Sequence, residues 1–359
     1  MYKELGFARG CVIMKIAIDP YVNKGNEYIE IIKRACAISN IETCSITSSV
    51  KSISKFINTR IYFFNWYENI GKNRYTAPIK FLIKISFILL LKIFRKKIVW
   101  TMHNKRPHNT KTSLYISLIM HFMIKVSDRI IILSNETRYI ISSIMKSDKY
   151  INKTFLVPHP NYIDSLNLIN TDKSNGIKTF LFFGRVQPYK NIELILSIAR
   201  DIPCDKARFI IAGNPISQKY KNEIIEKAKN SNVQLKLYFI ENNEIVELMH
   251  NSDCVILPLD MTSSLNSGSV YFAFSNKCTV ICPLIGTIKD IENDNMYFTY
   301  SYTTINEHRL ALKNAIEKVI ETDSDVLLQM GQRAFDYVKQ NNSIEIIADR
   351  IKMLVSSLS

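Results

Sequence analysis

The chain lacks the features that mark several special classes of protein. Its seven cysteines are an odd number and include no CxxC pair, so neither a zinc site nor a disulfide framework is indicated, and a reducing cytoplasm is expected. The N-terminus has no apolar stretch followed by a small-residue cleavage site, so we expect no signal peptide and a first strand near Met14. No short repeat or low-complexity tract is present.

Acidic residues are missing from a long part of the N-terminal half. No Asp or Glu occurs between Asn69 and Ser127, whereas twelve Lys and Arg residues lie there and account for most of the net charge of +15. These cations are Lys72, Arg74, Lys80, Lys84, Lys92, Arg95, Lys96, Lys97, Lys105, Arg106, Lys111 and Lys125. A one-sided basic field attracts a polyanion or an anionic membrane, and we expect residues 72–111 to meet a membrane surface.

Residues 77–94 within this stretch form a predicted helix that has two interpretations. Its apolar middle, Ile85–Leu91, is too short for the roughly 20 residues that cross a bilayer. Its cations share one arc of a helical wheel, and apolar residues cover the rest. The helix is therefore either a buried helix with a basic exposed edge, or a helix that rests on the inner leaflet through its cations and partial insertion.

What is present is the composition of a globular protein, with 47% hydrophobic and 22% charged residues in a chain long enough for two domains. Strand-like and helix-like stretches alternate almost throughout, which is typical of α/β layers with parallel sheets. The expected strands are 12–18, 61–64, 97–102, 129–133, 179–183, 208–212, 233–239, 254–257 and 279–282. A polar linker at 170–176 predicts domains over residues 1–168 and 177–340, followed by an amphipathic segment, 341–359.

The most informative stretch is Thr179–Ala199. A buried-looking strand ends at Gly184, a short loop carries Arg185 and Lys190, and Asn191 is the predicted N-cap of a helix. Glycine lets the backbone approach a ligand, a helix N-terminus offers unpaired N–H groups, and cations neutralise charge. The pattern predicts a phosphate site, although an ordinary βα unit with solvent-facing cations would look the same.

The segment FFGRVQPYKN resembles the FGR-x-x-x-x-K segment that opens the C-terminal domain of GT-B glycosyltransferases, and the resemblance extends over most of the chain. These enzymes transfer a sugar from a nucleotide-sugar donor to an acceptor. The resemblance implies two Rossmann-like domains whose parallel sheets face a central cleft. It also implies a donor diphosphate bound by Arg185 and Lys190 beside Gly184, and a terminal helix that packs back on the first domain.

Loops after strands are expected to hold further site residues, because open α/β sheets bind ligands there. A histidine after a buried strand can contact a sugar hydroxyl or act as a base. The resemblance implies that role for His103, with His108 as a second candidate, and a histidine satisfied by backbone groups is the alternative. Asn104 and His108, together with Gly25 and Asn26 of the first loop, are expected on the acceptor side. The W-T-x-H-N-x-x-P-H run resembles bacterial surface-polysaccharide transferases.

Trp66 and Glu68 follow another strand. Trp66 suits stacking on a sugar ring of the acceptor, and Glu68 is a candidate general base for an inverting mechanism. A tryptophan that fills the core beside an exposed glutamate explains the same residues equally well.

A second anion-binding loop is predicted before a helix in the C-terminal half. Small hydroxyl residues and glycine form a nest of N–H groups there. Its residues are Asn266, Ser267, Gly268 and Ser269. The resemblance implies that this loop closes the diphosphate pocket opposite Arg185 and Lys190, and that the nucleotide base lies near Gly213 and Tyr238.

The sequence departs from the large retaining family at one motif. That family carries two glutamates in an E-x7-E pattern, whereas Ser264 and Phe272 occupy those places here. The second glutamate normally holds the donor ribose, so the ribose contacts must differ, and retaining or inverting chemistry stays open. No DxD-type metal motif is evident, so we expect no obligatory metal and no cofactor besides the nucleotide sugar.

These features predict a cytoplasmic GT-B glycosyltransferase, peripheral on the inner face of the cell membrane. We expect it to add a hexose-type sugar from a UDP- or GDP-sugar to a polyprenyl-diphosphate-linked oligosaccharide for capsule, O-antigen or exopolysaccharide. A nucleotide-sugar epimerase of the same fold is the alternative and would need no lipid acceptor. A nucleic-acid-binding protein ranks lower, because the basic region lacks RNP-like aromatics and a helix-turn-helix.

Overall fold

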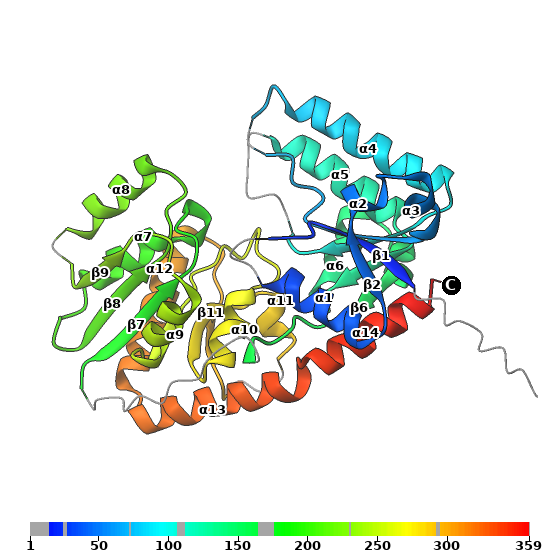
Figure 1. Cartoon of the computed structure of the whole chain (residues 1–359). Coiled ribbons are helices and arrows are strands. Elements are labelled where there is room, and N and C mark those ends of the chain that lie inside the picture. Colours follow the sequence, from blue (N-terminus) through cyan, green and yellow to red (C-terminus); the bar gives the residue numbers. More distant parts are fainter. Residues whose placement is uncertain are drawn as a thin grey trace, which may run out of the picture.

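The computed structural model describes residues 14–23, 27–71, 73–105, 112–163, 176–229, 231–291 and 295–358. Its strands form two six-stranded parallel sheets, with the order β2-β1-β3-β4-β5-β6 in the N-terminal domain and β12-β11-β10-β7-β8-β9 in the C-terminal domain. Figure 1 shows the two domains side by side, with helices covering the sheets. The predicted α/β fold with two parallel sheets is confirmed.

The N-terminal sheet is built from short apolar strands, as expected for a parallel sheet covered on both faces. Its strands are β1 (Lys15–Asp19), β2 (Glu42–Ser45), β3 (Ile61–Asn65), β4 (Lys97–Met102), β5 (Arg129–Ile132) and β6 (Thr154–Leu156). The helices are α1 (Tyr28–Ile38), α2 (Ile46–Ser49), α3 (Ile53–Asn58), α4 (Ala77–Ile93), α5 (Ser113–Val126) and α6 (Glu136–Met145), followed by the 3-10 helix η2 (Asp148–Lys153).

The C-terminal sheet repeats this design. Its strands are β7 (Lys178–Phe183), β8 (Ala207–Ala212), β9 (Val233–Lys236), β10 (Cys254–Ile256), β11 (Thr279–Pro283) and β12 (Phe298–Tyr300). The helices are η4 (Pro188–Lys190), α7 (Ile192–Ala199), α8 (Gln218–Ala228), α9 (Asn242–His250), α10 (Gly268–Ser275), α11 (Gly286–Lys289), α12 (Ile305–Glu321), α13 (Ser324–Asn341) and α14 (Ile344–Ser356).

The last two helices connect the domains. Helix α13 runs along the C-terminal domain, and α14 continues from it across to the N-terminal domain (Figure 1). There α14 packs against α1, and its Ile351 and Leu354 are buried in the same core as Ile16 and Ile29. The hydroxyl of Ser39 donates a hydrogen bond to the carbonyl of Ala348 at 2.8 Å.

Helix α4 differs from the buried-helix interpretation, because much of its solvent-facing side is apolar; the membrane interpretation stays a prediction. Six of its aliphatic residues are 44% to 75% exposed: Ile79, Leu82, Ile83, Leu89, Leu90 and Ile93. Lys84 turns inward instead and donates to the carbonyls of Tyr67 and Asn69, at 2.6 and 2.9 Å. Lys92 pairs with Asp128 at 2.7 Å. The expected basic exposed edge is therefore wrong for these two lysines.

Candidate active site between the two domains

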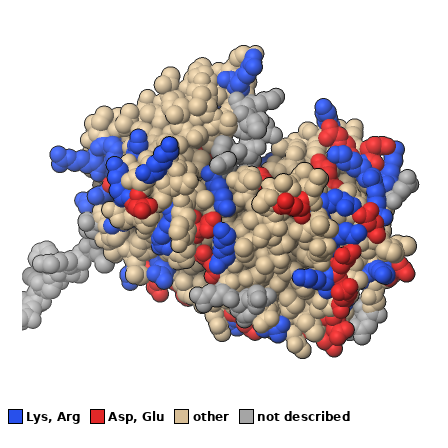
Figure 2. Space-filling view, turned by 180° about the vertical axis from the view of Figure 1, so that it is seen from behind, with Lys and Arg blue, Asp and Glu red and all other residues tan. Residues whose placement is uncertain are grey.

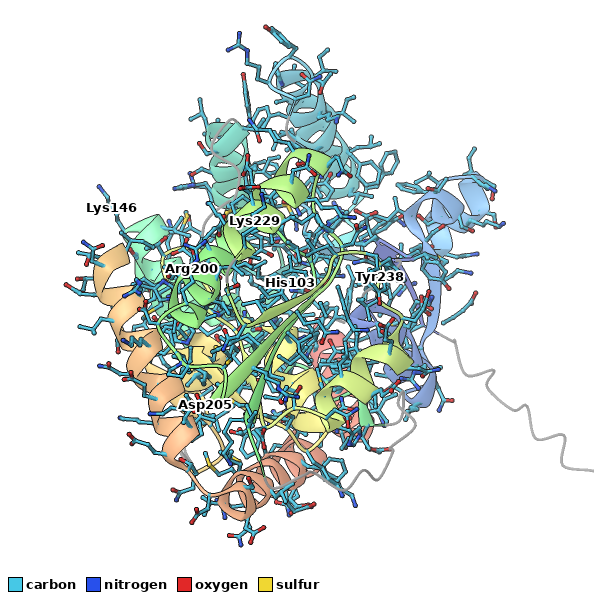
Figure 3. The ribbon with its side chains drawn as sticks, turned by 90° about the vertical axis from the view of Figure 1, so that its left-hand side faces the viewer. His103, Lys146, Arg200, Asp205, Lys229 and Tyr238 are labelled. Carbon is cyan, nitrogen blue, oxygen red and sulfur yellow. The ribbon has the colours of Figure 1, made fainter. Side chains whose placement is uncertain are left out.

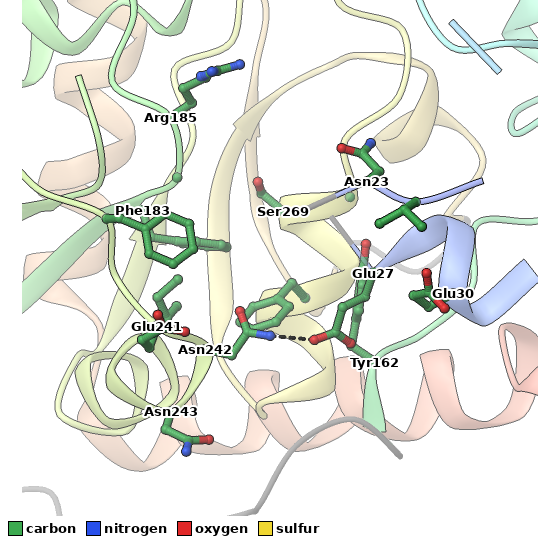
Figure 4. A pocket seen from close by; sticks show the side chains of 16 residues that line it. Asn23, Glu27, Glu30, Tyr162, Phe183, Arg185, Glu241, Asn242, Asn243 and Ser269 are labelled. Carbon is green, nitrogen blue, oxygen red and sulfur yellow. Dashed lines mark hydrogen bonds between the residues drawn. The ribbon is translucent and has the colours of Figure 1, made fainter. Parts of the chain in front are cut away.

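A cavity of about 680 Å³ lies between the two domains, at the carboxyl ends of the central strands. Figure 4 shows Phe183 and Arg185 of the C-terminal domain on one side, and Asn23, Glu27 and Glu30 of the N-terminal domain on the other. The amide of Asn242 donates to the carboxylate of Glu27 and so bridges the domains at one side of the cavity. The remaining lining residues are Val22, Tyr162, Gly184, Phe239, Glu241, Asn243, Ile245, Gly268, Ser269 and Phe272.

Two segments of the C-terminal domain give this cavity a place for an anion. Gly184 and Arg185 directly follow β7, and the Arg185 side chain is exposed. Gly268 and Ser269 form the first turn of α10, where backbone N–H groups lack partners within the helix. The structure therefore brings the predicted basic loop and the predicted nest to one cavity, through Gly184, Arg185, Gly268 and Ser269.

Two glycines allow the backbones around this anion site to approach closely. A Cβ at Gly213, whose φ is +150°, would lie 1.7 Å from the carbonyl oxygen of Gly184. Gly213 therefore supports the turn after β7 from behind and does not line the cavity. A Cβ at Gly268 would lie 3.0 Å from Nε2 of His159, so the start of α10 is pressed against that histidine.

Lys190 follows Arg185 by five residues in the same loop and is not among the residues that line the cavity. It ends the turn η4 and is half-buried, and this burial lowers its pKa to about 8. Asn191 is the N-cap of α7 as predicted, but it adopts a left-handed conformation and its side chain makes no capping bond. Its amide donates instead to the carbonyl of Pro258 at 2.8 Å, which ties the basic loop to the end of β10.

His103 is buried in an aromatic cluster on the N-terminal side of the cleft. Its ring stacks on Trp66 with centroids 4.2 Å apart and meets the edge of Tyr28 at 5.3 Å. Nε2 lies 3.3 Å from the amide oxygen of Asn65, an acceptor, so Nε2 carries the proton. Burial lowers the pKa of His103 to about 3, and it is neutral at physiological pH.

His159 is a second buried histidine that the sequence argument missed. It stacks on Tyr271 with centroids 4.8 Å apart, and Nδ1 donates to the carbonyl of Pro160 at 2.9 Å. Burial lowers its pKa to about 4, so the neutral ring leaves Nε2 as an acceptor beside Gly268. Its position three residues after β6 was the available signal, but β6 itself was not predicted.

Two carboxylates near the carboxyl ends of strands in the N-terminal sheet have different environments. Glu68 is buried and accepts a hydrogen bond from Nε1 of Trp100 at 3.3 Å, and burial raises its pKa. Trp66 packs on His103, which agrees with the interpretation of a tryptophan that fills the core. That interpretation expected an exposed glutamate, whereas Glu68 is buried as well. Asp19, at the end of β1, is partly exposed; burial raises its pKa and the charge of Lys84 lowers it. Asp19 is thus the more accessible proton acceptor.

The other predicted site residues lie at different distances from the cavity. Figure 3 shows His103 near the centre of the molecule and Tyr238 to one side of it. The Tyr238 hydroxyl donates to Glu244 at 2.6 Å, and its neighbour Phe239 lines the cavity in its place.

Asn266 donates to the carbonyl of His103 at 3.4 Å. The backbone N–H of Ser267 donates to the hydroxyl of Thr287 at 3.0 Å, and Asn104 is partly exposed after His103. Gly25, Asn26 and His108 lie outside the described residues.

Aromatic residues occupy the side of the cavity where the E-x7-E pattern would place a glutamate. The ring of Phe272 lies 5.5 Å from that of Phe183 and 5.3 Å from that of Tyr162, and all three line the cavity. Ser264, at the other position of the pattern, is buried. An aromatic ring therefore stands where the second glutamate of the pattern would lie.

Neither a metal cluster nor a membrane-spanning helix is found in the part of the chain that the structure describes. No group of three or more His, Cys, Asp or Glu side chains there could hold a metal ion. No helix among the same residues is long and apolar enough to cross a bilayer.

Comparison with known proteins identifies the class of the C-terminal domain. Residues 169–336 match the family model described as "Glycosyl transferases group 1". A 105-residue segment is 27% identical to a GDP-mannose:glycolipid 4-beta-D-mannosyltransferase of Xanthomonas campestris, which is 29% of this chain and 29% of the length of that relative.

Solved structures resemble the whole chain. HepE of Anabaena, in complex with UDP and glucose, has a TM-score of 0.67 at 14% identity and covers 96% of this chain and 100% of its own. Sucrose-phosphate synthase of Thermosynechococcus elongatus has a TM-score of 0.71 at 13% identity, with 96% and 99% covered. A glycosyltransferase of Rickettsia africae has a TM-score of 0.65 at 16% identity, with 96% and 98% covered. The GT-B fold is thereby shown.

Proposed function

We propose that this chain, a glycosyltransferase by its group 1 domain and its GT-B fold, transfers a hexose-type sugar from a UDP- or GDP-sugar to a lipid-linked oligosaccharide in cell-surface polysaccharide synthesis. The observation that carries the proposal is the cavity in which Arg185 and the first turn of α10 face the N-terminal domain. The glycolipid-directed relative supports a lipid-linked acceptor and a GDP-sugar. HepE, in complex with UDP and glucose, supports a UDP-sugar.

In this proposal the C-terminal domain stabilises the departing nucleoside diphosphate. Negative charge develops on the diphosphate as the bond to the sugar breaks. Arg185 neutralises part of that charge, the N–H groups of Gly268 and Ser269 donate to the phosphate oxygens, and Lys190 adds a charge nearby. Asp19 is our candidate to accept the proton of the acceptor hydroxyl, and Glu68 is given no proton-transfer role because it is enclosed.

The diphosphate contact is tested with Arg185→Ala. The native protein is first screened by thermal shift against UDP, GDP, UDP-glucose and GDP-mannose. We expect ligands of one nucleotide, either the uridine or the guanosine type, to raise its melting temperature. The variant should bind that ligand about 10- to 100-fold more weakly, because a charge-assisted contact contributes roughly 1.5–3 kcal/mol. Its melting temperature without ligand should be unchanged, because the Arg185 side chain is exposed.

Arg208→Ala is the matched control, since Arg208 is an exposed arginine of β8 in the same domain and lies outside the cavity lining. Equal ligand affinity in the Arg185 and Arg208 variants would remove the diphosphate assignment. An epimerase is distinguished by incubation with the donor alone, because it would convert the sugar without any acceptor.

We also propose that the N-terminal domain docks on an anionic membrane through α4. The exposed aliphatic face of this helix, defined above from Ile79 to Ile93, is suited to partial insertion. Figure 2 shows the corresponding end of the N-terminal domain largely without charged side chains, while Lys and Arg gather beside it. Exposed apolar residues bordered by cations are the combination that holds a protein on an anionic leaflet.

Membrane docking is tested by Ile83→Asp combined with Leu90→Asp, two exposed residues of α4. We expect binding to phosphatidylglycerol-containing vesicles, measured by co-sedimentation, to fall at least 10-fold, because charged groups would enter the lipid interface. Ile225→Asp on α8, also an exposed isoleucine, should bind as the native protein does. Undiminished vesicle binding by the α4 variant would contradict docking through this face.

A further inference from the structure

A second cavity, of about 810 Å³, lies in the N-terminal domain at the edge of the sheet opposite to the cleft. It is lined where β3 and β4 begin, by Ile61 and Lys97, whereas the active-site cavity lies where strands end. Helix α3 and Phe94, just after α4, form its outer wall. The two cavities therefore lie at opposite ends of the domain's strands, and this one is separate from the proposed sugar transfer.

The wall of this cavity is apolar and open. Ile53, Phe56 and Ile57 of α3 face Phe94, and the rings of Phe56 and Phe94 meet edge to face at 5.2 Å. Helix α3 has no fully buried residue, and Ile53 and Ile57 remain 80% and 61% exposed. Two isoleucines with such large exposed fractions indicate a surface on which an apolar ligand would be bound favourably.

The rim of the cavity is positively charged. Arg60, Arg95 and Lys97 line it, all three are exposed, and none of them takes part in the ion pairs between described residues. Among the lining residues that the structure describes there is no Asp or Glu. The cavity thus pairs an apolar interior with three cations, and no acidic residue of its described lining offsets their charge.

Lys96 has a different role from the rim cations. Its ammonium donates to the carbonyls of Phe56 and Ile57, at 2.6 and 3.1 Å, and lies over the ring of Phe56. These bonds hold the last turn of α3 against the start of β4. Burial and the charge of Arg60 both lower the pKa of Lys96, and the carbonyls of Phe56 and Ile57 already accept its hydrogen bonds.

We infer that this cavity binds an anionic phospholipid, with an acyl chain between α3 and Phe94 and the phosphate at Arg60, Arg95 and Lys97. The exposed face of α4 ends at Ile93, next to Phe94, so the cavity continues the surface proposed above to meet the membrane. The proposed membrane contact of α4 is general adsorption to a surface, whereas this cavity would bind one lipid molecule. Complementary charge at the rim selects an acidic headgroup.

Dihexanoyl-phosphatidylglycerol below its micelle concentration tests the site without a bilayer. Isothermal titration calorimetry of the full chain should give saturable binding, and the zwitterionic phosphatidylcholine of the same chain length should bind at least 10-fold more weakly. Arg60→Ser with Arg95→Ser should weaken phosphatidylglycerol binding about 10-fold, and Ile57→Asp should do the same through the apolar wall. Lys206→Ser with Lys219→Ser, two exposed lysines of the C-terminal domain, controls for net charge.

Each outcome decides the inference. The α4 variant Ile83→Asp with Leu90→Asp should lose vesicle binding yet keep the monomeric lipid, so failure of α4 docking and failure of this site are distinguishable. Equal binding of the two lipids, no saturable binding, or unchanged affinity in the Arg60/Arg95 and Ile57 variants overturns the inference. Binding only by a chain that starts at Met14 also overturns it, because residues 1–13 would then be the natural occupant.

Discussion

Burial sets the charge of individual residues in the cleft. The neutral forms of His103 and His159 are favoured because their pKa values fall to about 3 and 4. The cations that we propose for the diphosphate are then Arg185, which is exposed and lines the cavity, and Lys190, whose pKa is lowered to about 8. Three carboxylates, Glu27, Glu30 and Glu241, also line the cavity, and Arg185 is the cation among its described lining residues.

Under the proposed function, Lys190 should make donor binding depend on pH. The folded protein carries the charged ammonium below a pKa of about 8 and loses it as the pH rises through that value. Affinity for the nucleoside diphosphate should therefore be full at pH 7 and decline between pH 8 and 9, as measured by fluorescence or calorimetric titration. Lys190→Arg should abolish this decline, because the guanidinium keeps its proton throughout. A decline that persists unchanged in the arginine variant would rule Lys190 out as its origin.

Site residues differ in how far a sequence can predict them. Arg185 and Gly268 follow a strand or begin a helix with clear local patterns, and the cavity contains both. Glu68 looked accessible because it follows a strand, yet only the fold places Trp100 against its carboxylate. His159 and Tyr162 were missed because their role depends on contacts with Tyr271 and Phe272, more than a hundred residues away.

Elements with strong internal patterns were predictable, and weakly patterned ones were not. The central strands β3, β4 and β7 have long apolar runs and match the expected ranges closely. The edge strands β2, β6 and β12 have three or four residues, and together only two of these are buried, so they show too little periodicity. The strand expected over 233–239 ends at Lys236, and Phe239, three residues later, lines the cavity.

Helix α13 depends on a glycine in its middle. A Cβ at Gly331 would lie 2.0 Å from the carbonyl oxygen of Lys277, at the turn between α10 and β11. Gly331→Ala should raise intrinsic helix propensity and still lower the free energy of unfolding by about 1–3 kcal/mol, because α13 must move away from that turn. Chemical denaturation measures the loss. Gln332→Ala, on the exposed side of the same helix, should be nearly neutral, and equal stability of the two variants would contradict the close approach.

Several polar contacts join the two domains in addition to the packing of α14 on α1. The backbone N–H of Asn135 at the start of α6 donates to Asp290 of the C-terminal domain at 2.6 Å, and Lys289 pairs with Glu136 at 2.9 Å. On the cavity side, Asn242 bridges to Glu27. Each of these pairs is separated by more than 150 residues, and exposed polar side chains carry no periodic signal, so the sequence predicted two facing domains without predicting what joins them.

Asp290→Ala tests whether these contacts hold the domains together. Asp290 supplies a carboxylate at the N-terminus of a helix in the other domain, where negative charge and an acceptor both stabilise the first turn. Its loss should speed hydrogen exchange at the Asn135 amide about 5-fold, since an N-cap contributes roughly 1 kcal/mol. Small-angle scattering of the ligand-free variant should give a larger radius of gyration, because one hydrogen-bonded contact between the domains is removed.

Asp325→Ala is the control for this variant. Asp325 is an acidic residue in the first turn of α13, so its loss removes a similar charge without touching the N-terminal domain, and hydrogen exchange and radius of gyration should both stay unchanged. If Asp290→Ala exchanges and scatters as the native protein does, the remaining contacts, including the α14 helix against α1, set the domain arrangement on their own.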